Sequence, residues 1–244
     1  MTLAASPRAV LFDMDGVLVD NSRLYAAAWN EFVRAHPDAC QTYPAQRTFG
    51  RRNRELIPEL FGRPIAGGEL QRLSWELESG YWRRVGAGLE PLPGLRPFLA
   101  ELRRRGIPTA LASSAPGHNV RRVLEALRLE HRFDQVLAEE DVRQGKPDPE
   151  IYLTAAARLG AEARDCVVFE DALAGIAAAR AAGAPCLALA TTYPADALRQ
   201  AGAAAVLRDF FDPELGRYLG WQPVAAAALT GEDALPLASR RGDR

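Results

Sequence analysis

The sequence predicts an α/β fold: a mostly parallel sheet flanked by helices and interrupted by a helical insertion. From residue 93 onward, short apolar runs alternate with amphipathic helical patterns, which is typical of a parallel sheet with helical connections. Residues 21–88 instead show amphipathic helices and no convincing strand. At 244 residues the chain is long for one compact domain and short for two, so one domain with an insertion fits its length.

Five apolar runs are expected to form the strands. They are short, and several end abruptly in acidic or hydroxyl side chains, as buried parallel strands end at a loop. In chain order they cover residues 9–12, 108–112, 135–138, 166–169 and 185–189, of which 135–138 is the weakest candidate.

The insertion and the end of the chain set the expected domain boundaries. The segment that leaves the insertion, residues 86–94, is rich in glycine and proline and suits a hinge between two bodies. We therefore expect a core made of residues 1–20 and 89–225 and a helical domain at 21–88. The alanine-rich and then charged tail, residues 226–244, is expected to be flexible.

Composition sets limits on partners and location. The net charge is −1 and basic residues are scattered, so no attraction to nucleic acid or to an anionic membrane is expected. Three irregularly spaced cysteines fit neither a disulfide framework nor a zinc site. No signal-like or bilayer-spanning segment is apparent. We therefore expect a cytoplasmic protein, and we expect it to be a monomer.

The first acidic motif follows the expected strand 9–12. Asp13 and Asp15 are two residues apart, so an extended backbone would point both carboxylates to one side. Their repulsion is relieved if one binds a cation and the other is partly protonated, which separates a nucleophile from an acid–base group. Gly16 would let the chain turn sharply after them. Alone, this motif fits a calcium loop or an exposed turn equally well.

A second pair of acids, Glu170 and Asp171, follows the expected strand 166–169. One acid could simply cap the alanine-rich helix that comes next. Capping does not explain two strands that both end in paired acids, and carboxylate oxygens are ligands that suit Mg²⁺. In a parallel sheet both pairs would lie at the carboxyl edge, where α/β proteins bind ligands.

Two further segments offer groups that could hold phosphate. Ser113 and Ser114 follow the expected strand 108–112, where a hydroxyl and helix-start amides can hold phosphate oxygens, although serine there is often a simple cap. Lys146 is the only lysine, whereas arginine fills the other basic positions. An ammonium and a guanidinium are not interchangeable at a crowded site, which marks Lys146 as a candidate. One lysine in an arginine-biased composition is the alternative explanation.

Taken together and in order, these motifs resemble the haloacid dehalogenase superfamily, in its β-phosphoglucomutase-like subfamily of phosphatases and phosphomutases. The resemblance runs from about residue 9 to about residue 207 and implies a Rossmann-like, doubly wound core with an inserted α-helical cap. It rests on Asp13-Met14-Asp15-Gly16-Val17-Leu18-Val19-Asp20, Ala112-Ser113-Ser114, Gly145-Lys146-Pro147-Asp148-Pro149 and Phe169-Glu170-Asp171-Ala172-Leu173-Ala174-Gly175.

The resemblance implies roles for the acids. Asp13 would attack phosphorus and form an aspartyl-phosphate, while Asp15 would protonate the leaving alkoxide and later deprotonate water. Mg²⁺ would be held by Asp13, the backbone carbonyl of Asp15 and Asp171, with Glu170 ligating directly or through water.

It also implies roles at the phosphate. Lys146 and the hydroxyl of Ser113 would offset charge on the transferring phosphoryl oxygens, because phosphoryl transfer depends on positioning and electrostatics. The neighbouring Ser114 matches the family's phosphate-binding hydroxyl less well than Ser113 does. We expect it to contact the substrate instead.

The expected substrate contacts lie in the cap. Sugar phosphomutases of this subfamily carry a Tyr-His pair four to five residues before the tryptophan that corresponds to Trp29; counting back four gives Tyr25, without the histidine. This favours water as the phosphoryl acceptor. Arg51, Arg52 and Arg54 could hold a second phosphate or carboxylate, although such arginines are usually solvated.

The prediction is therefore a Mg²⁺-dependent phosphatase for a small phosphorylated metabolite, such as a sugar phosphate. The main alternative is a sugar phosphomutase. A non-catalytic binding protein would be expected to lack at least one of Asp13, Asp15, Lys146 and Asp171, and all four are present. A phosphonatase would need a cap lysine, and residues 21–88 contain none.

Overall fold

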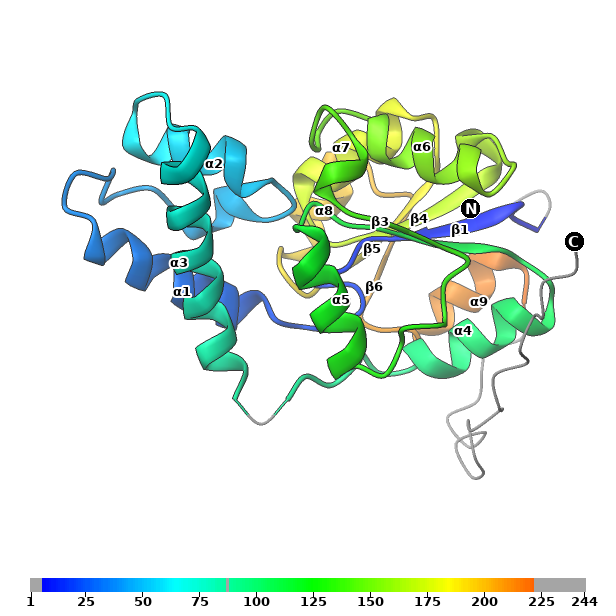
Figure 1. The fold of residues 1–244 in the computed structure, drawn as a ribbon. Coiled ribbons are helices and arrows are strands. Elements are labelled where there is room, and N and C mark those ends of the chain that lie inside the picture. The colour runs from blue at the N-terminus through cyan, green and yellow to red at the C-terminus, as the bar shows by residue number, and fades with distance from the viewer. Residues whose placement is uncertain (1–5, 87, 222–244) are drawn as a thin grey trace, which may run out of the picture.

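A parallel six-stranded sheet forms the centre of the computed structural model, which describes residues 6–86 and 88–221 (Figure 1). The strand order is β3-β2-β1-β4-β5-β6, and every neighbouring pair is parallel. This is the doubly wound order of Rossmann-like folds, in which the direction of winding reverses beside β1. The strands are β1 (Ala9–Phe12), β2 (Thr109–Ala112), β3 (Gln135–Leu137), β4 (Cys166–Glu170), β5 (Cys186–Leu189) and β6 (Ala205–Leu207).

Helices cover both faces of the sheet, so the central strands are apolar on both sides. In β1, Val10 and Phe12 pack into one hydrophobic cluster and Ala9 and Leu11 into the other. This explains the continuous apolar runs in the sequence. Figure 1 shows α4 and α9 on one side of the strands and α6 and α7 on the other. One face carries α4 (Leu95–Arg104), α5 (Gly117–Ala126) and α9 (Pro213–Leu219); the other carries α6 (Glu150–Arg158), α7 (Leu173–Ala181) and α8 (Ala195–Ala201).

A helical insertion between β1 and α4, which we call the cap, packs around a hydrophobic cluster of its own. Trp29, Leu56 and Leu73, from three different helices, are buried in this cluster. Figure 1 shows the cap beside the sheet rather than on either of its faces. Its elements are α1 (Ser22–Ala35), the 3₁₀ turn η1 (Ala45–Thr48), α2 (Asn53–Phe61) and α3 (Gly67–Val85).

The structure confirms the predicted fold class and adds one strand to it. All five expected strands are present, with ends within a residue or two of the prediction. Strand β6 was not predicted, because it is only three residues long and only its last side chain is fully buried. The exact domain boundaries stay predictions, and the expected tail at 226–244 lies outside the described residues.

Two short 3₁₀ turns complete the core, η2 (Glu139–Asp141) after β3 and η3 (Ala163–Asp165) before β4. Within the described residues, no helix has the length and apolar character needed to cross a bilayer.

Candidate active site

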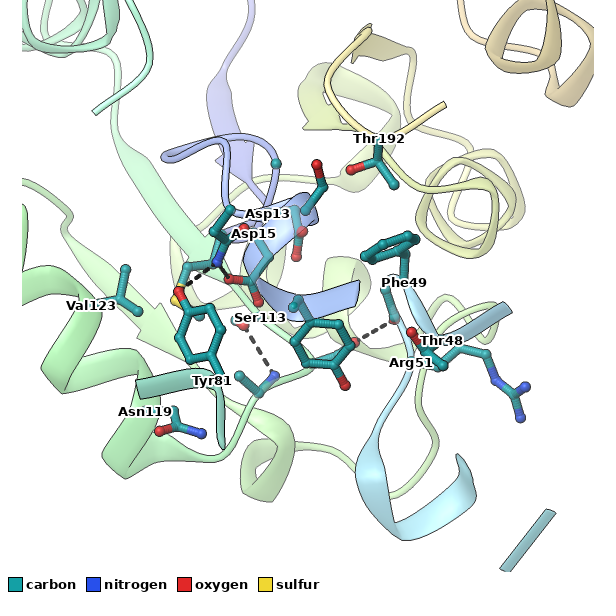
Figure 2. A pocket seen from close by; sticks show the side chains of 18 of the residues that line it. Asp13, Asp15, Thr48, Phe49, Arg51, Tyr81, Ser113, Asn119, Val123 and Thr192 are labelled. Atoms are coloured by element: carbon teal, nitrogen blue, oxygen red, sulfur yellow. Dashed lines mark hydrogen bonds between the residues drawn. The ribbon is translucent and has the colours of Figure 1, made fainter. Parts of the chain in front are cut away.

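The predicted core residues meet at the carboxyl edge of the sheet. Asp13 follows β1, Ser113 follows β2, and Glu170 is the last residue of β4. Backbone hydrogen bonds extend past the strands and fix these positions: the amide of Asp13 donates to the Phe169 carbonyl (3.0 Å) and the amide of Ser113 to the Leu137 carbonyl (3.0 Å). Figure 2 shows Asp13, Asp15 and Ser113 gathered at one side of a cavity.

Lys146 lies at the centre of this cluster and is fully buried. Its Nζ donates to Asp13 Oδ1 (2.6 Å), to Glu170 Oε1 (2.7 Å) and to the Ala112 carbonyl (3.2 Å). Burial lowers the pKa of Lys146, but the two carboxylates outweigh this and raise the pKa above its ordinary value. The ammonium therefore stays charged and holds the ends of β1 and β4 together.

The nucleophile candidate, Asp13, is only 4% exposed, so its charge depends on neighbours rather than on water. Burial raises the pKa of Asp13 to about 7, with Lys146 opposing the rise and Glu170 adding to it. Without a second cation, the carboxyl would thus be partly protonated near neutral pH. Because burial raises the pKa of both Asp13 and Asp15, the predicted division between an ionised nucleophile and a protonated acid–base group would depend on a cation bound beside Asp13 and stays a prediction.

Glu170 is held more tightly than any other acid of the cluster. Its Oε1 accepts hydrogen bonds from Lys146 and from the Tyr152 hydroxyl (2.6 Å), and its Oε2 accepts from the amides of Asp171 (3.0 Å) and Ala172 (3.1 Å). Two carboxylate oxygens offer about four acceptor sites, and these bonds use all of them. Direct ligation of a metal by Glu170 would therefore require it to give up one of these bonds.

The acids can nevertheless accommodate a cation. One carboxylate oxygen from each of Asp13, Glu170 and Asp171 lies within 4.8 Å of the other two. Burial and the neighbouring acids raise the pKa of Asp171 well above its ordinary value, a repulsion that a divalent cation would relieve. Hard oxygen ligands of this kind fit Mg²⁺. This arrangement requires glycine at position 16, where φ is +76° and a Cβ would lie 1.9 Å from Asp171 Oδ2.

The acid–base candidate, Asp15, is aimed by a residue that the sequence analysis missed. Asn21 Nδ2 donates to Asp15 Oδ1 (2.6 Å) and to the hydroxyl of Tyr81 (2.8 Å) in cap helix α3. Burial raises the pKa of Asp15, while the hydrogen bond from Asn21 lowers it. Figure 2 shows Tyr81 beside Asp15, so the position of this carboxyl is coupled to the cap.

The two serines take different places. The Oγ of Ser113, which is 1% exposed, accepts a hydrogen bond from the amide of Ala115 (3.1 Å), so its own hydrogen remains to donate to a phosphate oxygen. The Oγ of Ser114 donates to the Gly50 carbonyl (2.8 Å) and so joins the core to the cap.

The arginine cluster of the cap does not converge on the cavity. Arg51 lines it, but its guanidinium pairs with Glu59 (2.9 Å) and points away from Asp13 in Figure 2. Arg52 is buried and donates to Glu55 and to core carbonyls that include Arg143 (3.1 Å).

Arg54 and Tyr25, the two remaining cap residues that were expected to contact the substrate, lie in different places. Arg54 is exposed on α2 and is not among the residues that line the cavity. Tyr25 does line it, and its hydroxyl donates to Asn53 Oδ1 (3.4 Å).

Comparison with known proteins agrees with this arrangement. Residues 7–183 match the family model of haloacid dehalogenase-like hydrolases. The chain belongs to this family. It is 33% identical over 202 residues to a phosphorylated carbohydrates phosphatase of Thermotoga maritima, covering 82% of this chain and 94% of that protein. It is 32% identical over 187 residues to a β-phosphoglucomutase of Bacillus subtilis, covering 72% and 80%. A crystal structure of a hydrolase from Pseudomonas syringae is similar with a TM-score of 0.72 at 29% identity, covering 82% of this chain and 93% of that one.

These similarities confirm the resemblance to the β-phosphoglucomutase-like subfamily and the predicted enzyme class, a phosphoric monoester hydrolase.

In this haloacid dehalogenase-like hydrolase, Thr192 is the second site residue, after Asn21, that was not predicted from the sequence. Its hydroxyl donates to Asp171 Oδ2. Thr192 follows β5 at the same edge of the sheet, so the rule that identified Asp13 and Ser113 could have found it. Asn21 carries no comparable signal, because one of its two partners, Tyr81, comes from a cap helix far along the chain.

Proposed function

We propose that this hydrolase is a Mg²⁺-dependent phosphatase that releases phosphate from a small phosphorylated carbohydrate through an aspartyl-phosphate on Asp13. One observation carries the proposal: Lys146 bridges Asp13 and Glu170 beside Asp171, so nucleophile, fixed cation and candidate metal ligands share one buried cluster. The Thermotoga relative named as a phosphorylated carbohydrates phosphatase supports the substrate class.

In the first step, a carboxylate oxygen of Asp13 attacks phosphorus and the bond to the alkoxide breaks. Asp15, whose raised pKa favours the protonated form, gives its proton to that alkoxide. In the second step, Asp15 takes a proton from water, which attacks the aspartyl-phosphate and restores Asp13. Asn21 holds Asp15 on the cavity side during both transfers.

Fixed positive charge and hydrogen-bond donors support both steps. Asp13 and Asp171, with the carbonyl of Asp15, would hold Mg²⁺, which when bound offsets negative charge on the phosphoryl oxygens. Lys146 keeps Asp13 oriented, and the hydroxyl of Ser113 donates to a phosphoryl oxygen. Positioned charges of this kind supply most of the catalysis in phosphoryl transfer.

The competing function is a sugar phosphomutase, since a β-phosphoglucomutase is among the relatives. We favour water as the acceptor because this chain lacks the histidine of the Tyr-His pair that mutases of this subfamily carry before the tryptophan. Tyr25 is the residue four positions before Trp29. Burial, with the charges of Asp15 and Glu78, raises the pKa of Tyr25, so this hydroxyl is a donor and not a base. Conversion of β-glucose 1-phosphate into glucose 6-phosphate instead of free phosphate would favour the mutase.

The deciding experiment measures phosphate release from a panel of sugar and polyol monophosphates, with Mg²⁺ and with a chelator. The Asp13→Asn protein should be inactive, and a matched control, Asp196→Asn on the surface of α8, should retain activity. Turnover that survives chelation or the Asp13→Asn change would contradict the mechanism. The monomeric state and cytoplasmic location stay predictions, to be checked by light scattering and by cell fractionation.

A further inference from the structure

The cap side of the cavity carries an acid, Glu78, that the mechanism does not use. Glu78 belongs to α3, lines the cavity and is 7% exposed. Acidic side chains are seldom so buried unless they are paired or serve a ligand. It lines the same cavity as Asp13 and Ser113 but belongs to the cap, so it could contact the part of a substrate that does not react.

Glu78 is part of a hydrogen-bonded chain that crosses the cap. Tyr25 donates to Asn53 Oδ1 (3.4 Å), and Asn53 Nδ2 donates to Glu78 Oε1 (3.3 Å). Glu78 Oε2 lies 2.7 Å from His118 Nε2 in core helix α5. Each carboxylate oxygen can accept two hydrogen bonds and has one of these partners, so each retains an acceptor site that a substrate hydroxyl could fill.

The charged side chains of the cavity also favour substrates with one anionic group, the phosphate, over substrates with two. Its lining contains four carboxyl groups, Asp13, Asp15, Glu78 and Asp171, and one guanidinium, Arg51, which is paired with Glu59. Bound Mg²⁺ would offset the three acids of the core. Glu78 lies in the cap, apart from these three acids, so a second anionic group on the substrate would meet a carboxylate there, whose polar partners are Asn53 and His118.

We infer that Glu78, positioned by Asn53, is a specificity-determining residue that accepts hydrogen bonds from the distal hydroxyls of the substrate and excludes substrates with a second anionic group. This inference rests on the proposed function and narrows it to monophosphates with an uncharged polyol or sugar end. It also replaces the sequence-based expectation that the cap arginines hold a second phosphate or carboxylate.

The contact with His118 could give Glu78 a different role, that of a latch between cap and core. Its bond to His118 joins cap to core, as does the bond from Trp82 Nε1 to Asn119 Oδ1 (2.8 Å). A latch would influence every substrate alike, whereas a specificity residue changes the ratio between substrates. The ratio is therefore the measurement that separates the two roles.

The test uses sorbitol 6-phosphate and 6-phosphogluconate, which differ only in a hydroxymethyl or a carboxylate at the end remote from phosphate. Both are measured as competitive inhibitors of p-nitrophenyl phosphate hydrolysis with the full Mg²⁺-loaded enzyme, so the result does not depend on their turnover. The variants are Glu78→Gln, His118→Ala and a matched control on α3, Glu76→Gln, which pairs with His36 and does not line the cavity.

We expect wild type and Glu76→Gln to bind sorbitol 6-phosphate about tenfold or more tightly than 6-phosphogluconate, the factor expected from one like-charge contact in a protein site. Glu78→Gln should bring the two inhibition constants within about threefold, whereas His118→Ala should keep the wild-type ratio. Equal binding by wild type, or no competition by either compound, would overturn the inference without any variant.

A uniform loss of affinity in Glu78→Gln, matched by His118→Ala, would also overturn it, since that is the behaviour of a latch. Hydrolysis of p-nitrophenyl phosphate serves as the separate readout of the proposed function. If wild type hydrolyses it and the Asp13→Asn protein does not, the phosphatase stands even when the inference about Glu78 fails.

Discussion

Replacement of Lys146 by methionine would leave two buried carboxylates without their counter-ion. The side chains of Lys146 and Glu170 are 0% exposed and that of Asp13 is 5% exposed, so water cannot take over the role of the ammonium. Methionine fills a similar volume without charge. The change therefore isolates the electrostatic contribution of the lysine to stability.

Removal of one partner of a buried ion pair typically costs about 3–5 kcal/mol, because the charge left behind stays desolvated. Lys146 serves two carboxylates, and protonation of one of them would limit the loss, so we expect the free energy of unfolding to fall by about 3–5 kcal/mol. A domain typically has about 5–15 kcal/mol in total. The variant should thus be folded but strongly destabilised.

Urea unfolding without metal, near neutral pH, gives the midpoint and the slope. The matched control is Arg199→Met, whose pair with Asp196 is 60% and 87% exposed and should contribute less than about 1 kcal/mol. Adding Glu170→Gln to Lys146→Met should recover part of the loss, because one unpaired charge is removed. A loss below about 1 kcal/mol for Lys146→Met would refute the reasoning.

Three further predictions concern the metal, a glycine and the cap. Because the pKa of Asp13 is raised to about 7, that of Asp171 is also raised, and ligation needs the ionised forms, Mg²⁺ affinity in calorimetry should rise with pH through about 7; a flat profile would contradict this. Gly175→Ala, whose Cβ would lie 1.6 Å from Glu170 Oε1, should cost about 1–3 kcal/mol or more in urea unfolding, whereas Gly68→Ala, with nothing within 4 Å, should not. Trp82→Phe removes a hydrogen bond between cap and core and should cost about 1 kcal/mol; an unchanged midpoint would argue against that contact.

The sequence by itself determined five of the six strands and the core of the site. Continuous apolar runs that end in polar residues predicted five strands. Because the carboxyl ends of parallel strands share one edge of the sheet, they also predicted that Asp13, Ser113 and Glu170 lie close together. The single lysine at position 146 also belongs to that cluster. These features are readable because they depend on local periodicity and on the common direction of parallel strands.

Only the tertiary structure decided what lies on the other side of the cavity. Whether Arg51 or Glu78 faces the cavity depends on how the cap helices and the loop before α2 pack against one another, and amphipathic patterns do not fix which polar side chain turns inward. Asn21 likewise has a role only because Tyr81 packs beside it from a distant part of the chain. The motif Asp13-Met14-Asp15-Gly16 thus indicated the family and its enzyme class, whereas the packing of cap against core decides which side chains line the rest of the cavity.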